Sequence, residues 1–205
     1  MFINQRKREL NLKIVYYGPA LSGKTTNLQY IHTHTGSNRK GDLISLKTRE
    51  DRTVFFDYLM LELGQVAGLK PKFNLYTVPG QVYYASTRKL VLQGADGVVF
   101  VADSQLDRMP ENLTALRDMA KYMREVGINP RYVPIVLQFN KRDLPEIAPV
   151  PVLRSYLGIR GEVPPCLEAS ALHGDGVFDT LKLVINRVIR QVQNRLRKPE
   201  LSHAS

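Results

Sequence analysis

Residues 18 to 25 read Gly-Pro-Ala-Leu-Ser-Gly-Lys-Thr and match the phosphate-loop pattern G-x-x-x-x-G-K-[ST] at every position. In such a loop, backbone N–H groups and a helix N-terminus attract anions, and glycines let the backbone approach closely. Lys24 would reach the β- and γ-phosphates of a nucleotide, and the Thr25 hydroxyl would ligate Mg²⁺. The expected phosphate-binding residues are Gly18, Pro19, Ala20, Leu21, Ser22, Gly23, Lys24, Thr25 and Thr26.

A second motif, Asn140-Lys141-Arg142-Asp143, follows an apolar segment that ends at Phe139. In an open α/β sheet, the ends of such segments deliver the ligand contacts. A carboxylate at position 143 can accept two hydrogen bonds from N1–H and N2–H₂ of guanine, a donor pair that adenine lacks. The phosphate loop alone leaves kinases, ATPases and GTPases open, and this second motif favours guanine.

Hydrophobic periodicity predicts the elements that must hold these two motifs. A strand precedes the phosphate loop, a helix follows it, and strands and helices then alternate along the chain. The predicted strands cover residues 12–17, 54–63, 72–78, 97–102, 133–139 and 166–170, and the predicted helices cover residues 24–31, 110–126 and 176–196. This pattern is typical of a three-layer α/β domain of the P-loop NTPase type. We expect six or so mostly parallel strands, with the ligand beyond their carboxyl ends.

The second and third predicted strands are joined by a short connection between Gly64 and Gly68, which predicts an antiparallel hairpin at one edge of the sheet. Residues 54–63 are apolar at nearly every position. A strand with two apolar faces loses less when its pairing slips by one residue, so this strand is a candidate for a change of register. The alternative is a strand buried on both faces in one fixed register, as is common in α/β sheets.

Composition limits the class of protein. The chain has 205 residues, 43% of them hydrophobic, and we expect one domain over residues 1–198 with a short tail at 199–205. No apolar run approaches the length of a membrane span, and the amino terminus lacks the apolar core of a signal peptide, so we expect a cytoplasmic protein. The single cysteine, Cys166, excludes an intramolecular disulfide and a Cys-rich metal site.

The formal net charge of +10 is compatible with nucleic acid, an anionic membrane or nucleotides, and it selects none of them. Much of the excess lies at residues 6–8 and 187–198. Position 2 is Phe rather than the Gly of a myristoylation signal, and residues 201–205 are not a prenylation box. We expect no nucleic-acid partner, and membrane contact that is at most electrostatic or indirect.

The order of the phosphate loop and the N-K-x-D motif resembles the Ras-like GTPase superfamily. By that resemblance Asn140, Lys141 and Asp143 bind guanine. The family also uses a short S-A-[KL] stretch after its last strand, whose backbone N–H contacts the guanine oxygen, and here Ser170-Ala171-Leu172 occupies that place. The resemblance implies a Ras-like fold and a GTP/GDP switch that uses Mg²⁺.

Residues 77–81, Thr-Val-Pro-Gly-Gln, narrow the resemblance, because Ras-like proteins usually carry D-x-x-G-Q there. The Thr in place of Asp, together with residues 52–57 and 101–104, resembles the MglA-type bacterial GTPases of cell polarity and gliding motility. The resemblance runs from near residue 3 to the closing helix. It implies motility or polarity effectors and, as activating protein, an MglB-like homodimer of the roadblock type.

The same resemblance assigns the residues of hydrolysis. Gln81 would orient the attacking water, Gly80 would offer its N–H to the γ-phosphate, and Thr53 would close over that phosphate and ligate Mg²⁺ together with Thr25. Arg52 would be an intrinsic arginine finger that stabilises the charge of the transition state. The plainer alternative for Arg52 is a solvent-exposed arginine among neighbouring charges.

Thr77 leaves the expected Mg²⁺ shell without its usual aspartate. Asp103, at the end of another predicted strand, could help through a water molecule, or it could cap the helix that follows. The sequence leaves both roles open.

Two other functions compete with a GTPase switch. One is a GTP-binding scaffold or adaptor that hardly hydrolyses, against which Gln81 and Arg52 argue. The other is a P-loop kinase for a small metabolite, which would leave residues 140–143 unexplained.

Overall fold

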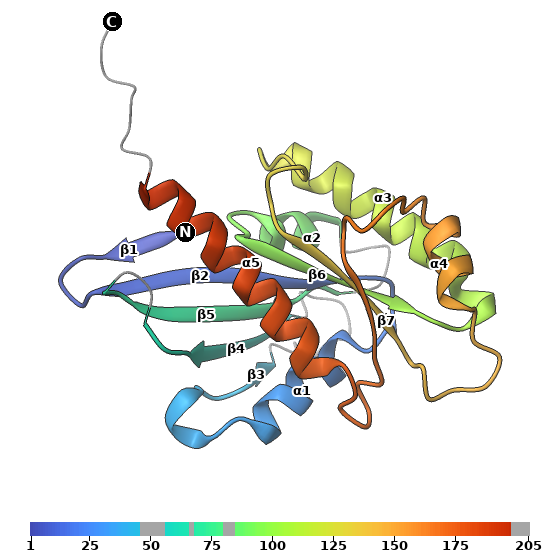
Figure 1. The fold of residues 1–205 in the computed structure, drawn as a ribbon, viewed down its shortest axis with the longest axis horizontal. Coiled ribbons are helices and arrows are strands. Elements are labelled where there is room, and N and C mark those ends of the chain that lie inside the picture. The colour runs from blue at the N-terminus through green and yellow to red at the C-terminus, as the bar shows by residue number, and fades with distance from the viewer. Residues whose placement is uncertain (46–55, 66–67, 80–84, 198–205) are drawn as a thin grey trace, which may run out of the picture.

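The computed structural model describes residues 1–45, 56–65, 68–79 and 85–197. Its middle layer is an eight-stranded sheet in the order β3-β4-β5-β2-β6-β7-β8, with β1 paired to β2 beside this path (Figure 1). The strands are β1 (Phe2–Asn4), β2 (Glu9–Tyr17), β3 (Ile44–Ser45), β4 (Asp57–Glu62), β5 (Lys70–Thr77), β6 (Gly97–Asp103), β7 (Ile135–Asn140) and β8 (Cys166–Glu168).

Strands β5, β2, β6, β7 and β8 run parallel to one another. The antiparallel pairs are β3 with β4, β4 with β5, and β1 with β2. The predicted mostly parallel sheet with an antiparallel edge is therefore confirmed. The short strands β1 and β3 were not predicted.

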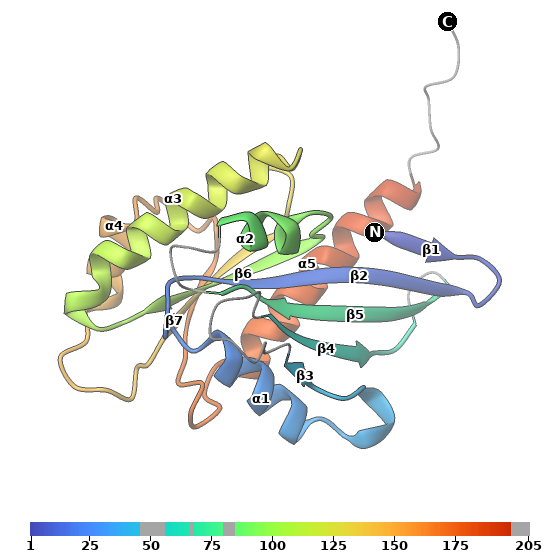
Figure 2. The same cartoon turned by 180° about the vertical axis from the view of Figure 1, so that it is seen from behind.

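Five α-helices complete the layers among the described residues. They are α1 (Lys24–His34), α2 (Ala85–Leu92), α3 (Met109–Glu125), α4 (Val150–Tyr156) and α5 (Val177–Arg197). Helices α1 and α5 pack on one face of the sheet, and α2, α3 and α4 pack on the other. Figure 2 shows α5 behind the strands and α2 in front of them. None of the helices in the described part of the chain is both long and apolar enough to cross a membrane.

Helix α5 has the sequence of an amphipathic helix that covers a sheet. Its buried side chains recur at three- and four-residue spacing, which places them on one stripe. They are Val177, Leu181, Val184, Ile185, Val188 and Val192. Beneath them, every residue of the central strand β6 is buried, so the helix and this strand are in close contact.

The two faces of β4 are not equally buried. Asp57, Leu59 and Leu61 are buried, whereas Tyr58 and Met60 are half-exposed and Glu62 is exposed. The alternative of a strand buried on both faces is wrong, because helices α1 and α5 pack on the face that carries Leu59 and Leu61 and the other face stays partly exposed. One buried face fixes the register of a strand. Residues 54 and 55, which the prediction included, lie outside the described part of the chain.

A buried polar cluster ties α1 and α5 to β7. The side-chain amides of Asn27 and Gln138 exchange two hydrogen bonds, of 2.9 and 3.0 Å. Gln138 also donates to the Thr180 hydroxyl at 3.1 Å. A fully satisfied polar cluster in a core fixes one relative position of its elements.

Gly97 allows α5 to lie directly on β6, and its replacement by alanine should destabilise the fold. A Cβ atom at this position would come 2.6 Å from Val188 Cγ2 and 3.1 Å from Val184 Cγ2. We expect Gly97→Ala to lower the free energy of unfolding by about 1–3 kcal/mol, measured by urea denaturation. Gly36→Ala is the matched control, because a Cβ at Gly36 meets nothing within 4 Å. Equal stability of the two variants would contradict this account.

Candidate functional site

The phosphate loop follows β2 and leads into α1, as predicted. Gly23 caps the helix in the left-handed conformation, with φ of 95°. A Cβ atom at Gly23 would lie 2.2 Å from Asn140 Nδ2. Both the conformation and the close approach therefore require glycine. The contact also brings the predicted phosphate loop against the predicted guanine motif.

Lys24 is buried inside the phosphate loop. Its ammonium group donates to the carbonyls of Gly18 at 3.1 Å and of Pro19 at 2.5 Å. Burial lowers the pKa of Lys24 to about 7, and the positive charge of Arg88 adds to this effect, whereas Asp57 opposes it. A buried cation held by carbonyl dipoles is stabilised by an anion beside it. The loop therefore fits a phosphate group.

The remaining residues of the predicted phosphate set differ in their exposure to solvent. Thr26 is half-buried in the first turn of α1, and Ser22 is fully buried. Leu21 has a φ of 62° and is 82% exposed, and the carbonyl of Ala20 accepts a hydrogen bond from Arg108 at 3.2 Å. The guanidinium of Arg108 thus supports the loop from outside, a contact that the sequence analysis did not identify.

Asp57, at the start of β4, is the main site residue that the sequence analysis missed. Its buried carboxylate accepts hydrogen bonds at one oxygen from the hydroxyls of Thr25 (2.6 Å) and Thr77 (2.9 Å). Its other oxygen accepts from the Ser45 hydroxyl at 2.7 Å. Position 77 carries Thr where Ras-like proteins usually carry Asp, and Asp57 of the neighbouring strand β4 places a carboxylate beside it.

This cluster fits Mg²⁺ in its chemistry. Hydroxyl and carboxylate oxygens are the ligands that the ion prefers, and Thr25 and Asp57 place them side by side. The hydroxyl groups of Thr25, Thr77 and Ser45 donate to the Asp57 carboxylate, and the charge of Lys24 also acts on it. Thr25 would be a direct ligand, and Asp57 would act beside it.

Asn140 joins the phosphate loop to the predicted guanine loops. Its amide nitrogen donates to the Ser22 carbonyl at 2.8 Å, and its amide oxygen accepts from the Ala171 N–H at 2.8 Å. Asn140 is only 2% exposed, so both hydrogen bonds are shielded from water. Gly18–Thr25, residues 140–143 and residues 170–172 therefore form one site at the carboxyl ends of β2, β7 and β8.

Lys141 adopts a φ of 66° and forms an ion pair with Asp103 at 2.7 Å. Asp103 is fully buried, and its other oxygen accepts the Gln105 N–H at 3.1 Å. The caps of the helices that follow are Gln105 and Arg108. The prediction that Asp103 caps the helix that follows is therefore wrong. In the described part of the chain, the Asp103 carboxylate binds Lys141 rather than Thr25.

Asp143 lies at a cavity of about 200 Å³. Its side chain is 18% exposed, and the Ser170 hydroxyl beside it lowers the pKa of the carboxyl, with His173 and Lys141 adding positive charge. Asp143 therefore stays ionised at neutral pH, as a double acceptor must. The cavity is lined by Arg142, Asp143, Glu168, Ala169, Ser170 and Asp175. Leu172, the last residue of the predicted guanine loop, is 70% exposed.

Arg88, which the sequence analysis did not single out, supports the site from α2. Its side chain is 4% exposed, and its Nε donates to the Pro79 carbonyl at 3.0 Å. Its guanidinium also lies 3.6 Å from the Asp118 carboxylate and above the ring of Tyr17. Arg88 thus fixes the peptide that precedes Gly80.

Four predicted residues fall outside the described part of the chain. They are Arg52 and Thr53, before β4, and Gly80 and Gln81, after β5.

The sequence has relatives among known proteins. It is 52% identical over 192 residues to the mutual gliding-motility protein MglA of Myxococcus xanthus, covering 94% of this chain and 97% of the relative. The chain belongs to the MglA family of Ras-like small GTPases. It is also 26% identical to ADP-ribosylation factor-like protein 6 of Caenorhabditis elegans over 92% of both chains, and 25% identical to human ADP-ribosylation factor-like protein 4C over 88% of both. No protein-family model matches the chain.

Membership of the MglA family confirms the resemblance drawn from residues 77–81 and makes this protein a GTP-binding protein of the small GTPase class. The ADP-ribosylation factor-like relatives agree with the Ras-like α/β sheet and its phosphate loop. The alternative function of a P-loop kinase for a small metabolite is therefore excluded.

In this MglA-family site, Asp57→Asn should weaken Mg²⁺ binding, because it removes the charge beside Thr25 while keeping the shape of the side chain. Changes to groups that orient a metal ligand cost about 10–100-fold in metal affinity. We expect the Mg²⁺ concentration that half-protects bound fluorescent GDP from dissociation to rise by about tenfold or more.

Asp42→Asn is the control for that measurement, since Asp42 is an exposed carboxylate that precedes β4 in the sequence. An unchanged Mg²⁺ midpoint in Asp57→Asn, or the same shift in both variants, would remove Asp57 from the metal site.

Proposed function

We propose that this protein is a molecular switch that binds GTP or GDP with Mg²⁺, hydrolyses GTP slowly, and works as one domain over residues 1–198 in the cytoplasm. The observation that carries the proposal is the double hydrogen bond of Asn140, to Ser22 in the phosphate loop and to Ala171 in the guanine loop. A ligand with a phosphate at one end and a purine at the other would span the two loops that this amide holds together.

Guanine recognition rests on Asp143. Its carboxylate faces the cavity, is ionised, and could accept hydrogen bonds from N1–H and N2–H₂ of the base. Lys141, held by Asp103, and Asn140 would position the loop that carries it. Ser170, Ala171 and Leu172 would close the other side of the base.

Asp143→Asn should shift nucleotide preference from guanine toward xanthine. The amide of Asn presents a donor, which is unfavourable opposite the guanine N2–H₂ and favourable opposite the O2 acceptor of xanthine. We expect GTP affinity to fall by a factor of about 10² or more and XTP affinity to rise, measured by displacement of a fluorescent nucleotide. Asp175→Asn, which changes a carboxylate on the same cavity, should keep the preference for guanine. Equal affinity of the wild type for ATP and GTP would refute the proposal.

Hydrolysis would use residues from the two segments that flank β4 and β5. Gln81 would orient the attacking water, the Gly80 N–H would contact the γ-phosphate, and Arg52 would stabilise the charge that develops in the transition state. Lys24 would bind the β- and γ-phosphates from the buried position that it already occupies. Mg²⁺, bound by Thr25 and Thr53, would neutralise phosphate charge.

Gln81→Leu and Arg52→Ala should each retain GTP binding and lose turnover. Arginine fingers contribute about 10³ to 10⁵ in rate, so we expect single-turnover hydrolysis in Arg52→Ala, with an activating protein present, to fall by about 10³-fold. Arg49→Ala, three residues earlier, is the control. Wild-type turnover in Arg52→Ala would exclude the intrinsic finger. Negligible turnover of the wild type under the same conditions would favour a GTP-binding scaffold.

We also propose that the switch controls motility or cell polarity, since the Myxococcus xanthus relative is named for gliding motility. Its partners would be an MglB-like roadblock homodimer, as activating protein, and effectors that bind the GTP state. A half-exposed aromatic group on the face of β4 and β5 that points away from α1 and α5 suits such partners: Tyr58 and Phe56 lie 5.0 and 5.9 Å from the Tyr76 ring. Aromatic side chains are enriched at protein interfaces.

A further inference from the structure

The amino ends of the parallel strands carry two exposed aromatic side chains. Phe2, on β1, is 65% exposed, and Tyr132, in the segment that leads into β7, is 71% exposed. Exposed apolar residues that form one patch rimmed by polar residues mark an interaction site. These two residues lie near the amino ends of the parallel strands, whereas the phosphate loop follows the carboxyl end of β2.

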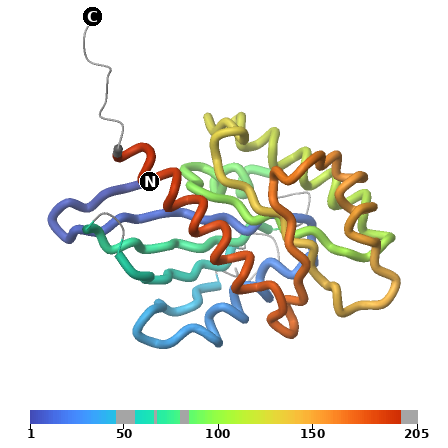
Figure 3. The backbone as a smooth tube through the Cα atoms, viewed as in Figure 1, coloured from blue at the N-terminus to red at the C-terminus, as the bar shows by residue number. Residues whose placement is uncertain are grey.

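Contacts between segments bring the strand that carries Phe2 and the segment that carries Tyr132 to the same end of the molecule. The amino group of Met1 pairs with Asp96 at 2.8 Å, and Asp96 lines a small hollow together with Gln191 and Arg195 of α5. Gln191 in turn donates to the Tyr132 carbonyl. The first strand, the end of α5 and the segment before β7 are therefore neighbours, at the end of the molecule where the chain begins (Figure 3).

Basic side chains are exposed at the same end of the molecule. Arg131 precedes Tyr132, Arg195 lines the hollow beside Asp96, and the turn between β1 and β2 carries the exposed run Arg6, Lys7 and Arg8. Within the described chain, none of these five cations has an ion-pair partner, whereas the nearby acids are paired: Asp96 with Met1, and Glu9 with Lys72 at 2.9 Å. We call Phe2, Tyr132, Arg131, Arg195 and residues 6–8 the amino-end surface.

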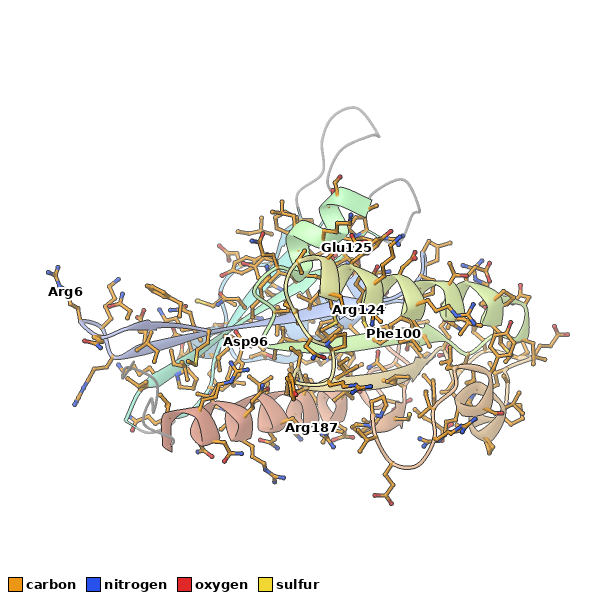
Figure 4. All side chains as sticks on the ribbon, turned by 90° about the horizontal axis from the view of Figure 1, so that it is seen from above. Arg6, Asp96, Phe100, Arg124, Glu125 and Arg187 are labelled. Atoms are coloured by element: carbon orange, nitrogen blue, oxygen red, sulfur yellow. The ribbon has the colours of Figure 1, made fainter. Side chains whose placement is uncertain are left out.

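The hairpin of β1 and β2 holds its part of this surface in place. Ile3 pairs with Leu10 in the sheet and packs against the core, and the Lys70 N–H donates to the Arg8 carbonyl at 2.7 Å. Arg6 therefore projects from the outer end of the hairpin (Figure 4). An ordered surface of this kind loses little conformational entropy on binding.

We propose that the amino-end surface binds the anionic headgroups of a lipid bilayer, with Phe2 and Tyr132 entering the interfacial region. Arginine and lysine are attracted to anionic lipids, and aromatic rings favour the membrane interface. A single-stranded nucleic acid is usually bound along a basic groove that follows its backbone, whereas here a projecting hairpin tip and a separate helix end carry the charge. In this orientation the nucleotide site faces away from the bilayer and stays open to partners.

Vesicle flotation of the full chain bound to GDP tests this surface. We expect binding to vesicles of phosphatidylcholine with 40% phosphatidylglycerol at low salt, little binding to pure phosphatidylcholine, and release by 0.5 M NaCl. Each basic residue near an anionic surface contributes about fivefold to partitioning, so Arg6→Glu/Lys7→Glu/Arg8→Glu should lower it by about 100-fold. Phe2→Ser should lower it in low salt without changing its salt dependence.

The matched control is Arg117→Glu/Arg160→Glu/Lys182→Glu, which makes the same change in net charge at exposed residues of α3, the segment after α4, and α5. It should bind vesicles far better than the hairpin variant. Fluorescent GDP affinity checks folding, and Arg131→Glu/Arg195→Glu tests the same surface without altering the hairpin. Equal loss in control and hairpin variants, no difference between the two vesicle types, or tighter binding to a DNA duplex than to anionic vesicles would each overturn the proposal.

Discussion

The side-chain amide of Asn140 is the contact on which the nucleotide site depends. It holds Ser22 of the phosphate loop with one atom and Ala171 of the guanine loop with the other. Gln138, two residues earlier, lies on the same face of β7 and holds Asn27 of α1 and Thr180 of α5. A buried hydrogen bond that is broken leaves groups unsatisfied at a cost of about 1–3 kcal/mol each, so one strand face fixes both helices and both loops.

Titratable groups at the site are in place before any ligand arrives. Lys24 brings a buried amine, whose pKa burial lowers to about 7, to the place for phosphate, and Asp57 brings a buried carboxylate to the place for a cation. Each is held by neutral dipoles, carbonyls for the lysine and hydroxyls for the aspartate. Because water is largely excluded there, the ligand charges would interact strongly with both groups.

The parallel sheet separates two kinds of surface. Loops at the carboxyl ends of β2, β7 and β8 carry the nucleotide chemistry, while the amino ends carry aromatic and basic side chains. Arg88 and Arg108 connect α2 and α3 to the nucleotide end through the carbonyls of Pro79 and Ala20. A small GTPase built in this way could contact a membrane at one end and exchange partners at the other.

The phosphate loop, the guanine motif and the order of the main strands could be predicted from the amino-acid sequence, because each of these is a continuous run whose chemistry or periodicity is local. Helices α2 and α4 could not, since they are too short for a helical period to be distinct, and neither could the role of Arg88, a charged residue that became buried. Asp57 joined the site only because β4 pairs with β5, which sets it opposite Thr77. Likewise, the apolar run around Leu59 acquired a buried and a half-exposed face only when α1 and α5 covered one side of the sheet. Such contacts depend on residues far apart in the chain, and only the tertiary structure brings them together.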